Sequence, residues 1–180
     1  MARVLLIGEG PLPSTDPKRL GFPQLRFEQF AGVLRAQGHE LQLADVAQSS
    51  LAEVRELRAR HLPELTVSAG PYEPARVAAL VVGREPLFVD VPGDPFAEAQ
   101  AKSSLAGQPD HSGPMRQAWL PALCRADAFG VISGSQRLAL LGQLGLLGRL
   151  TTSPAEARWV EVLPAGYGFG GLPERAPRRR

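Results

Sequence analysis

Two glycines follow the first apolar run of the chain, where α/β proteins commonly bind a phosphate or a sugar. The run at residues 4–7 leads directly into Gly8 and Gly10, with Glu9 between them. A glycine lacks a Cβ, so backbone N–H groups at such a turn can approach a ligand closely. The G-x-G-x-x-G fingerprint of dinucleotide-binding domains is incomplete, because Pro13 stands where its third glycine belongs. Since the P-loop pattern is absent as well, the sequence predicts neither a nicotinamide site nor a P-loop nucleotide site.

Three carboxylates lie where predicted strands end. Asp90 lies near the end of a strand predicted at 86–91, and Asp94 follows in a Pro-Gly-Asp-Pro turn. A carboxylate in this position is typical of a polar ligand contact and equally of a plain turn, so both interpretations stay open. Asp45 ends another predicted strand, but it lies 37 positions after Gly8, whereas a ribose-binding carboxylate is expected after about 20. We therefore interpret Asp45 as a turn residue.

The remaining chemistry-bearing residues do not form a catalytic set. His39, His61 and His111 lack metal-ligand spacing to one another and to Cys124. The Ser-Gly-Ser sequence at 133–135 follows a predicted strand but does not match G-x-S-x-G, and helix capping accounts for its serines. The sequence thus predicts no metal, no resident cofactor and no identifiable catalytic residue.

The elements that must hold these residues alternate between strand-like and helix-like segments. This alternation predicts a single Rossmann-like three-layer α/β sandwich with a mostly parallel sheet, whose ligands bind at the carboxyl ends of the strands. The proline-rich connection at 8–21 exceeds the usual length of about 2–6 residues for a βα loop, which is typical of functional or disordered loops. On one predicted helix, Glu98 and Lys102 have the spacing of a surface ion pair. Strands are predicted at 3–7, 40–46, 65–68, 86–91, 128–132 and 159–163, and helices at 22–37, 51–60, 73–82, 96–104, 115–125 and from about 133 to 147.

Length and composition limit the class of protein. A chain of 180 residues with 44% apolar residues suits one domain with a core of its own. The net charge is +2, but four arginines at 175 and 178–180 supply four positive charges, so residues 1–174 sum to −2. An acidic body without a basic stripe predicts no nucleic-acid partner. A single cysteine and the lack of an apolar run of membrane-spanning length predict a cytoplasmic protein without a transmembrane segment.

In their order along the chain, these segments resemble the N-terminal half of a retaining GT-B glycosyltransferase of the family 4 type. The opening RVLLIG, the loop ending at Gly21, the helix after it and RAQGHELQLADV are similar to that family's first βαβ unit. In the family a Gly-Gly pair starts the helix, and Phe22 replaces the second glycine here. RADAFGVISGSQRLALLGQLGLLGRL and VEVLPAGY are similar to its later strand and helix and to the stretch that leads into its second half. The resemblance covers residues 1–168 and leaves 169–180 as an expected flexible Gly/Pro/Arg-rich tail.

The resemblance implies transfer of a sugar from a nucleotide-sugar, a co-substrate, to a sugar or glycoconjugate acceptor. The family's first domain mainly shapes the acceptor side, and most donor contacts belong to a second domain. We therefore expect no turnover from this chain without a partner chain or a C-terminal domain. By the same resemblance, three glycines would face the cleft, an arginine one turn into the first helix would meet an anion, and two aspartates would add polar contacts. These candidate substrate-binding residues are Gly8, Gly10, Gly21, Arg26, Asp90 and Asp94.

Other interpretations stay open. Arg26 equally suits a solvated helix charge, in which case it has no ligand. A non-catalytic binding or assembly module would have the same alternation of strands and helices. A flavodoxin-like or other nucleotide-binding oxidoreductase is disfavoured by the incomplete glycine fingerprint.

Overall fold

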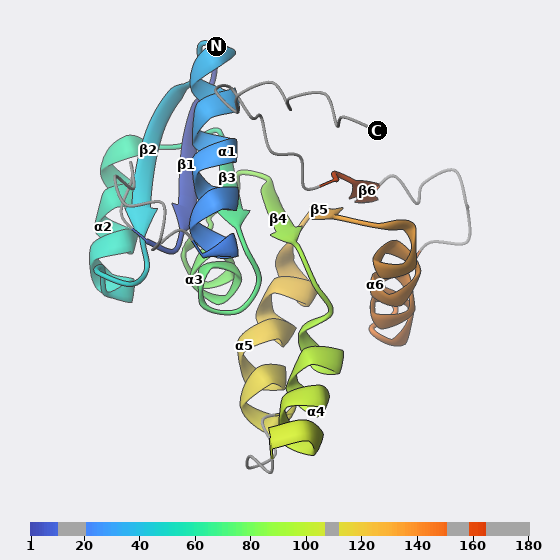
Figure 1. The fold of residues 1–180 in the computed structure, drawn as a ribbon. Coiled ribbons are helices and arrows are strands. Elements are labelled where there is room, and N and C mark those ends of the chain that lie inside the picture. The colour runs from blue at the N-terminus through green and yellow to red at the C-terminus, as the bar shows by residue number, and fades with distance from the viewer. Residues whose placement is uncertain (11–20, 107–111, 151–158, 165–180) are drawn as a thin grey trace, which may run out of the picture.

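The computed structural model describes residues 1–10, 21–106, 112–150 and 159–164. Within these ranges six strands form one sheet in the order β2-β1-β3-β4-β5-β6, and every neighbouring pair is parallel (Figure 1). The predicted Rossmann-like three-layer α/β fold is thereby confirmed. The strands are β1 (Arg3–Gly8), β2 (Glu40–Asp45), β3 (Leu65–Ala69), β4 (Leu87–Val91), β5 (Ala128–Val131) and β6 (Val160–Val162). The helices are α1 (Phe22–Ala36), α2 (Leu51–His61), α3 (Glu73–Val81), α4 (Pro95–Ala106), α5 (Ser112–Arg125) and α6 (Gly134–Leu146).

Two apolar clusters cover the two faces of the sheet. Leu5 and Ile7 of β1 belong to the larger cluster, which includes residues of α2, α3, α5 and α6. Val4 and Leu6 point to the opposite face and pack with α1, which crosses β1 and β3 in Figure 1. A strand with both faces buried needs apolar residues at every position, and this explains the continuous apolar run of β1.

The helix boundaries follow local capping signals. Ser50 and Glu53 form a capping box at the start of α2, in which the Glu53 carboxylate accepts from the Ser50 N–H at 2.7 Å. Ser133 caps α6, as one of the two serines was predicted to do. Asp94 accepts from two N–H groups in the first turn of α4, so this helix begins at Pro95 rather than at residue 96.

Two predicted helix boundaries differ around the connection between α4 and α5. The helix predicted at 96–104 continues to Ala106, and the helix predicted at 115–125 already begins at Ser112. Most of the long loop predicted at 8–21, and the tail predicted at 169–180, lie outside the described residues. No helix in the described part of the chain combines the length and apolarity needed to cross a membrane.

The strand order defines where a ligand is expected. β1 pairs with β2 on one side and with β3 on the other, so the chain reverses its direction of travel across the sheet there. In doubly wound sheets, ligands bind outside the carboxyl ends of the strands at such a switch point. The register also aligns Asp45 with Gly8 and, further along the sheet, Asp90 with Gly130.

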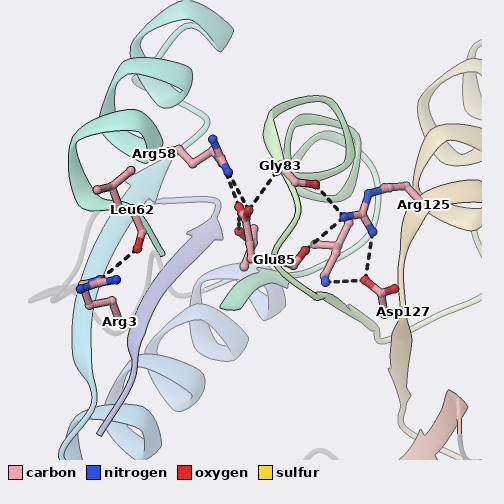
Figure 2. A network of polar contacts seen from close by, with 9 residues as sticks. Arg3, Arg58, Leu62, Gly83, Glu85, Arg125 and Asp127 are labelled. Atoms are coloured by element: carbon pink, nitrogen blue, oxygen red, sulfur yellow. Dashed lines mark hydrogen bonds and ion pairs between the residues drawn. The ribbon is translucent and has the colours of Figure 1, made fainter. Parts of the chain in front are cut away.

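A polar network joins several elements at the opposite, amino end of the sheet (Figure 2). Arg58 of α2 donates to Glu85 at 2.8 and 2.6 Å, and the Thr66 hydroxyl of β3 donates to the same carboxylate at 3.1 Å. Arg125 at the end of α5 donates to the carbonyl oxygens of Gly83 and Glu85 at 3.0 and 3.1 Å. Glu85 therefore links α2, β3, the connection before β4 and α5.

Gly8 lies where β1 passes beneath α1, and a side chain there should destabilise the protein. A Cβ on Gly8 would lie 2.4 Å from ring carbons of Phe27, which is buried. We expect Gly8→Ala to lower the free energy of unfolding by about 1–3 kcal/mol, measured by urea denaturation. The matched control is Gly32→Ala in α1, where nothing lies within 4 Å of the new Cβ. Alanine there should raise stability by about 0.5–1 kcal/mol, and unchanged stability of Gly8→Ala would contradict this account of the packing.

Candidate functional site

An open hollow of about 100 Å³ lies at the carboxyl ends of β1, β3 and β4. Glu9 follows β1, Phe22 begins α1, Tyr72 precedes α3, and Gly93 and Glu98 flank the start of α4. Four prolines complete its walls, namely Pro23, Pro71, Pro74 and Pro92. We call this space the switch-point hollow, because it lies at the place where the strand order reverses.

Tyr72 has an unusual backbone conformation at this hollow. It is the N-cap residue of α3, with φ 65° and ψ −124°, and Gly70 two positions before it has φ 132°. A bulky residue at positive φ costs about 1–3 kcal/mol and persists only where its surroundings impose it. The Tyr72 hydroxyl donates a short hydrogen bond to Glu98 Oε2. Burial, and then this contact with Glu98, raises the pKa of Tyr72 well above its ordinary value, so the hydroxyl stays protonated.

Glu98 is positioned by the start of α4. A Cβ on Gly93 would lie 2.1 Å from Glu98 Oε1, so glycine at this position leaves room for the carboxylate. The surface pair between Glu98 and Lys102 that the spacing predicted does not form among the described residues. Because Asp94 caps α4, Glu98 falls in the first turn of the helix and faces Tyr72 instead.

The charges of the switch-point hollow are all negative. Glu9 and Glu98 are the charged residues that line it, and within the described ranges no lysine or arginine does. Carboxylate oxygens only accept hydrogen bonds, so the hollow favours ligand groups that donate them. A phosphate would be repelled by two carboxylates there.

The structure brings together two of the predicted site residues, Arg26 and Asp90, but places them away from this hollow. Arg26 Nε donates to Asp90 Oδ2 at 2.8 Å, and Nη2 donates to Oδ1 at 2.5 Å. Arg26 is 5% exposed and Asp90 is fully buried, so the interpretation of Arg26 as a solvated charge is wrong. The guanidinium also lies 5.2 Å from the centre of the Phe30 ring.

Arg26 and Asp90 neutralise each other's charge inside the protein. Burial raises the pKa of the Asp90 carboxyl, and the hydrogen bonds and charge of Arg26 oppose that shift. Both carboxylate oxygens already accept from Arg26, which makes the pair a link between α1 and β4.

The predicted glycines mainly allow β1 and α1 to pack closely. Gly8 lies against Phe27, and a Cβ on Gly10 would lie 2.4 Å from the side chain of Gln24. The Gly10 N–H donates to Asp45 Oδ1 at 3.0 Å, and Asp45 also accepts from Ala47, so its predicted role in a turn is confirmed. Gly21 is exposed as the N-cap residue of α1, and none of the three glycines lines the switch-point hollow.

Sequence reasoning did not single out Tyr72 or Phe22 as ligand contacts and assigned Glu98 to the surface. The available signal was Gly70-Pro71, which begins two positions after the end of the strand predicted at 65–68. It is the kind of turn that drew attention to Asp94. Asp94 itself acts as a helix cap and lines a second, smaller hollow. Within the described ranges, no group of three or more His, Cys, Asp or Glu side chains is placed to hold a metal ion.

Comparison of the chain with known protein families, curated proteins and solved structures gave no match.

Proposed function

We propose that this chain is the acceptor-side half of a glycosyltransferase, which holds a sugar or glycoconjugate acceptor in the switch-point hollow. The observation that supports this best is the lining of the hollow, with two carboxylates, a tyrosine and no cationic side chain among the described residues. The order of the segments that resemble a GT-B N-terminal domain supports it as well. A second domain or partner chain supplies the nucleotide-sugar site, and this chain by itself transfers nothing.

The chemistry of the hollow suits a neutral polyhydroxylated ligand. Sugar hydroxyls donate hydrogen bonds to Glu9 and to Glu98, whose position the Tyr72 hydroxyl stabilises. The C–H face of a sugar packs on the Phe22 and Tyr72 rings and on the prolines around them. The negative charge disfavours a diphosphate, in keeping with a donor nucleotide bound elsewhere.

The test is a ligand-observed NMR titration of the full chain with neutral sugars, nucleotides and nucleotide-sugars. We expect weak binding of neutral sugars and no binding of nucleotides. Glu98→Gln removes a charged acceptor and should weaken sugar binding about tenfold or more, and Tyr72→Phe should weaken it less. Glu56→Gln, at an exposed position of α2, is the matched control and should leave binding unchanged.

Two outcomes would contradict the proposal. Tight nucleotide binding by this chain alone would overturn the assignment of the donor site to a second domain. Absence of sugar binding in the unmodified protein would favour the alternative, a non-catalytic binding or assembly module of the same fold.

A further inference from the structure

The walls of the switch-point hollow offer more hydrogen-bond acceptors than donors. Glu9 and Glu98 contribute carboxylate oxygens, which only accept. Four of its ten lining residues are prolines, which lack a backbone N–H but keep their carbonyl oxygen. The proton of the Tyr72 hydroxyl is already donated to Glu98 Oε2. A ligand group that must accept hydrogen bonds therefore finds few partners in this space.

The start of α4, beside the hollow, adds no free donor. Pro95 lacks an N–H, and the N–H groups of Phe96 and Ala97 both donate to Asp94 Oδ1, at 3.0 and 3.1 Å. The Glu98 N–H donates to the Asp94 carbonyl oxygen at 2.9 Å. The N–H groups with which the first turn of a helix usually binds an anion are thus absent or engaged.

Negative charge and aromatic rings act together in the same space. Burial, the hydrogen bond to Glu98 and the negative charges of Glu98 and Asp94 all raise the pKa of Tyr72, so its hydroxyl lies in a negative electrostatic field. Phe22 and Tyr72 line the hollow, and an aromatic ring attracts a cation that lies within about 6 Å of its centre. The group that fits best is a cation that donates hydrogen bonds and accepts none. A protonated primary amine has these properties, with three N–H donors and no acceptor, whereas a hydroxyl also accepts.

We propose that the acceptor is an amino sugar, whose protonated amino group lies between Glu9 and Glu98 in the switch-point hollow. The hollow of about 100 Å³ is well above the about 10–15 Å³ that one water needs, so it holds an ammonium group and the carbon that carries it. This inference rests on the proposed function, in which neutral sugars bind weakly, and it adds the group that strengthens their binding.

The test compares each hexose with its amino derivatives, using glucose against glucosamine, 3-amino-3-deoxyglucose and 6-amino-6-deoxyglucose, and galactose against galactosamine. Dissociation constants are measured by NMR titration of the full chain at about pH 6.5, at which an amino group is protonated. At least one amino sugar should bind about tenfold more tightly than its parent, because two carboxylates attract its charge. The uncharged N-acetyl derivative of that sugar should bind no more tightly than the parent.

The decisive variant is Glu9→Gln/Glu98→Gln. It keeps an acceptor for the Tyr72 hydroxyl but removes both negative charges of the hollow. The preference for the amino sugar, measured as the ratio of the two dissociation constants, should fall to about one. Glu56→Gln removes a charge from an exposed position of α2 and should keep the preference. Glu9→Gln alone should reduce the preference severalfold, and it replaces the double variant should that protein not fold.

Salt gives a readout that a change of shape would not affect. Raising the NaCl concentration from about 20 mM to about 500 mM should reduce the preference severalfold and leave the affinity for the parent hexose unchanged, because salt screens the attraction between charges.

The outcomes separate this inference from the proposed function. If hexoses bind and no amino derivative binds more tightly, the inference is wrong and the proposed function stands. If no sugar binds at all, both are wrong. A preference that persists in high salt and in the double variant would show that the amino group lies elsewhere.

Discussion

Glu85→Gln should lower the free energy of unfolding by about 3 kcal/mol at neutral pH, although Glu85 lies at the end of the sheet opposite the proposed site. The carboxylate accepts from Arg58, Thr66 and the Gly83 N–H, and its side chain is 5% exposed. An amide in this place turns a donor toward one of these donors and leaves Arg58 without its counter-charge. Urea denaturation of both proteins measures the difference.

The same residue predicts how stability depends on pH. Burial pushes the pKa of Glu85 up, but Arg58, the Glu85 and Gly83 N–H groups and Thr66 outweigh it and lower the pKa from 4.5 to about 2. A carboxyl with a lower pKa in the folded than in the unfolded protein stabilises fully above about pH 4.5 and loses this contribution as the pH falls toward 2. The difference corresponds to about 3 kcal/mol.

Glu85→Gln should therefore show a flatter loss of stability between pH 5 and pH 2 than the unmodified protein. Glu56→Gln removes the same charge from an exposed site and should reproduce the unmodified profile. Equal acid profiles for Glu85→Gln and the unmodified protein would show that the network contributes nothing to acid stability.

Much of the fold could be predicted because a parallel sheet covered on both faces needs continuous apolar strands. The strand predicted at 3–7 differs from β1 by one residue, and that at 159–163 contains all of β6. The order β2-β1-β3 could not be predicted, since alternation of strands and helices is the same whichever side β3 joins. The switch-point hollow lies where that order reverses, so its location could not be predicted from the sequence either.

The site was harder to predict than the fold, because contacts between distant residues leave no local pattern. Arg26 and Asp90 were each singled out, but they are 64 positions apart, and their pairing depends on where α1 lies against the sheet. Tyr72 is an aromatic residue that follows a strand, and such residues usually belong to a hydrophobic core. Its positive φ can be seen only in the backbone of the structure. Glu85 lies in a polar connection where charged residues are normally solvated, and only packing of α2 and α5 around it gives it a role.

Asp90→Asn should lower the free energy of unfolding by about 3–5 kcal/mol, more than Glu85→Gln. It keeps the shape of the side chain but leaves the Arg26 guanidinium, which is 5% exposed, without its counter-charge. Arg26→Met should be similarly costly at neutral pH, because it leaves a buried carboxylate. The double variant Arg26→Met/Asp90→Val should recover most of the loss, since replacing a whole buried ion pair by apolar groups is often neutral.

The pH profile of Arg26→Met distinguishes a buried pair from a ligand contact. Burial raises the pKa of Asp90 even beside Arg26, and without the guanidinium nothing opposes burial. A carboxyl with a higher pKa in the folded than in the unfolded protein stabilises at low pH and loses this contribution as the pH rises through the folded pKa. Arg26→Met should thus become more stable, relative to the unmodified protein, as the pH falls from 7 toward 4.

A different result would support the substrate-binding role that the resemblance implies for Arg26 and Asp90. If Asp90→Asn kept its free energy of unfolding and lost sugar binding, Asp90 would act as a substrate contact. We expect the reverse for Arg26→Met/Asp90→Val, which should fold and bind sugars with an affinity close to that of the unmodified protein. Both oxygens of Asp90 are engaged by Arg26, and neither residue lines the switch-point hollow. Measuring stability and sugar affinity on the same variants therefore separates the pair that joins α1 to β4 from the carboxylates that receive the ligand.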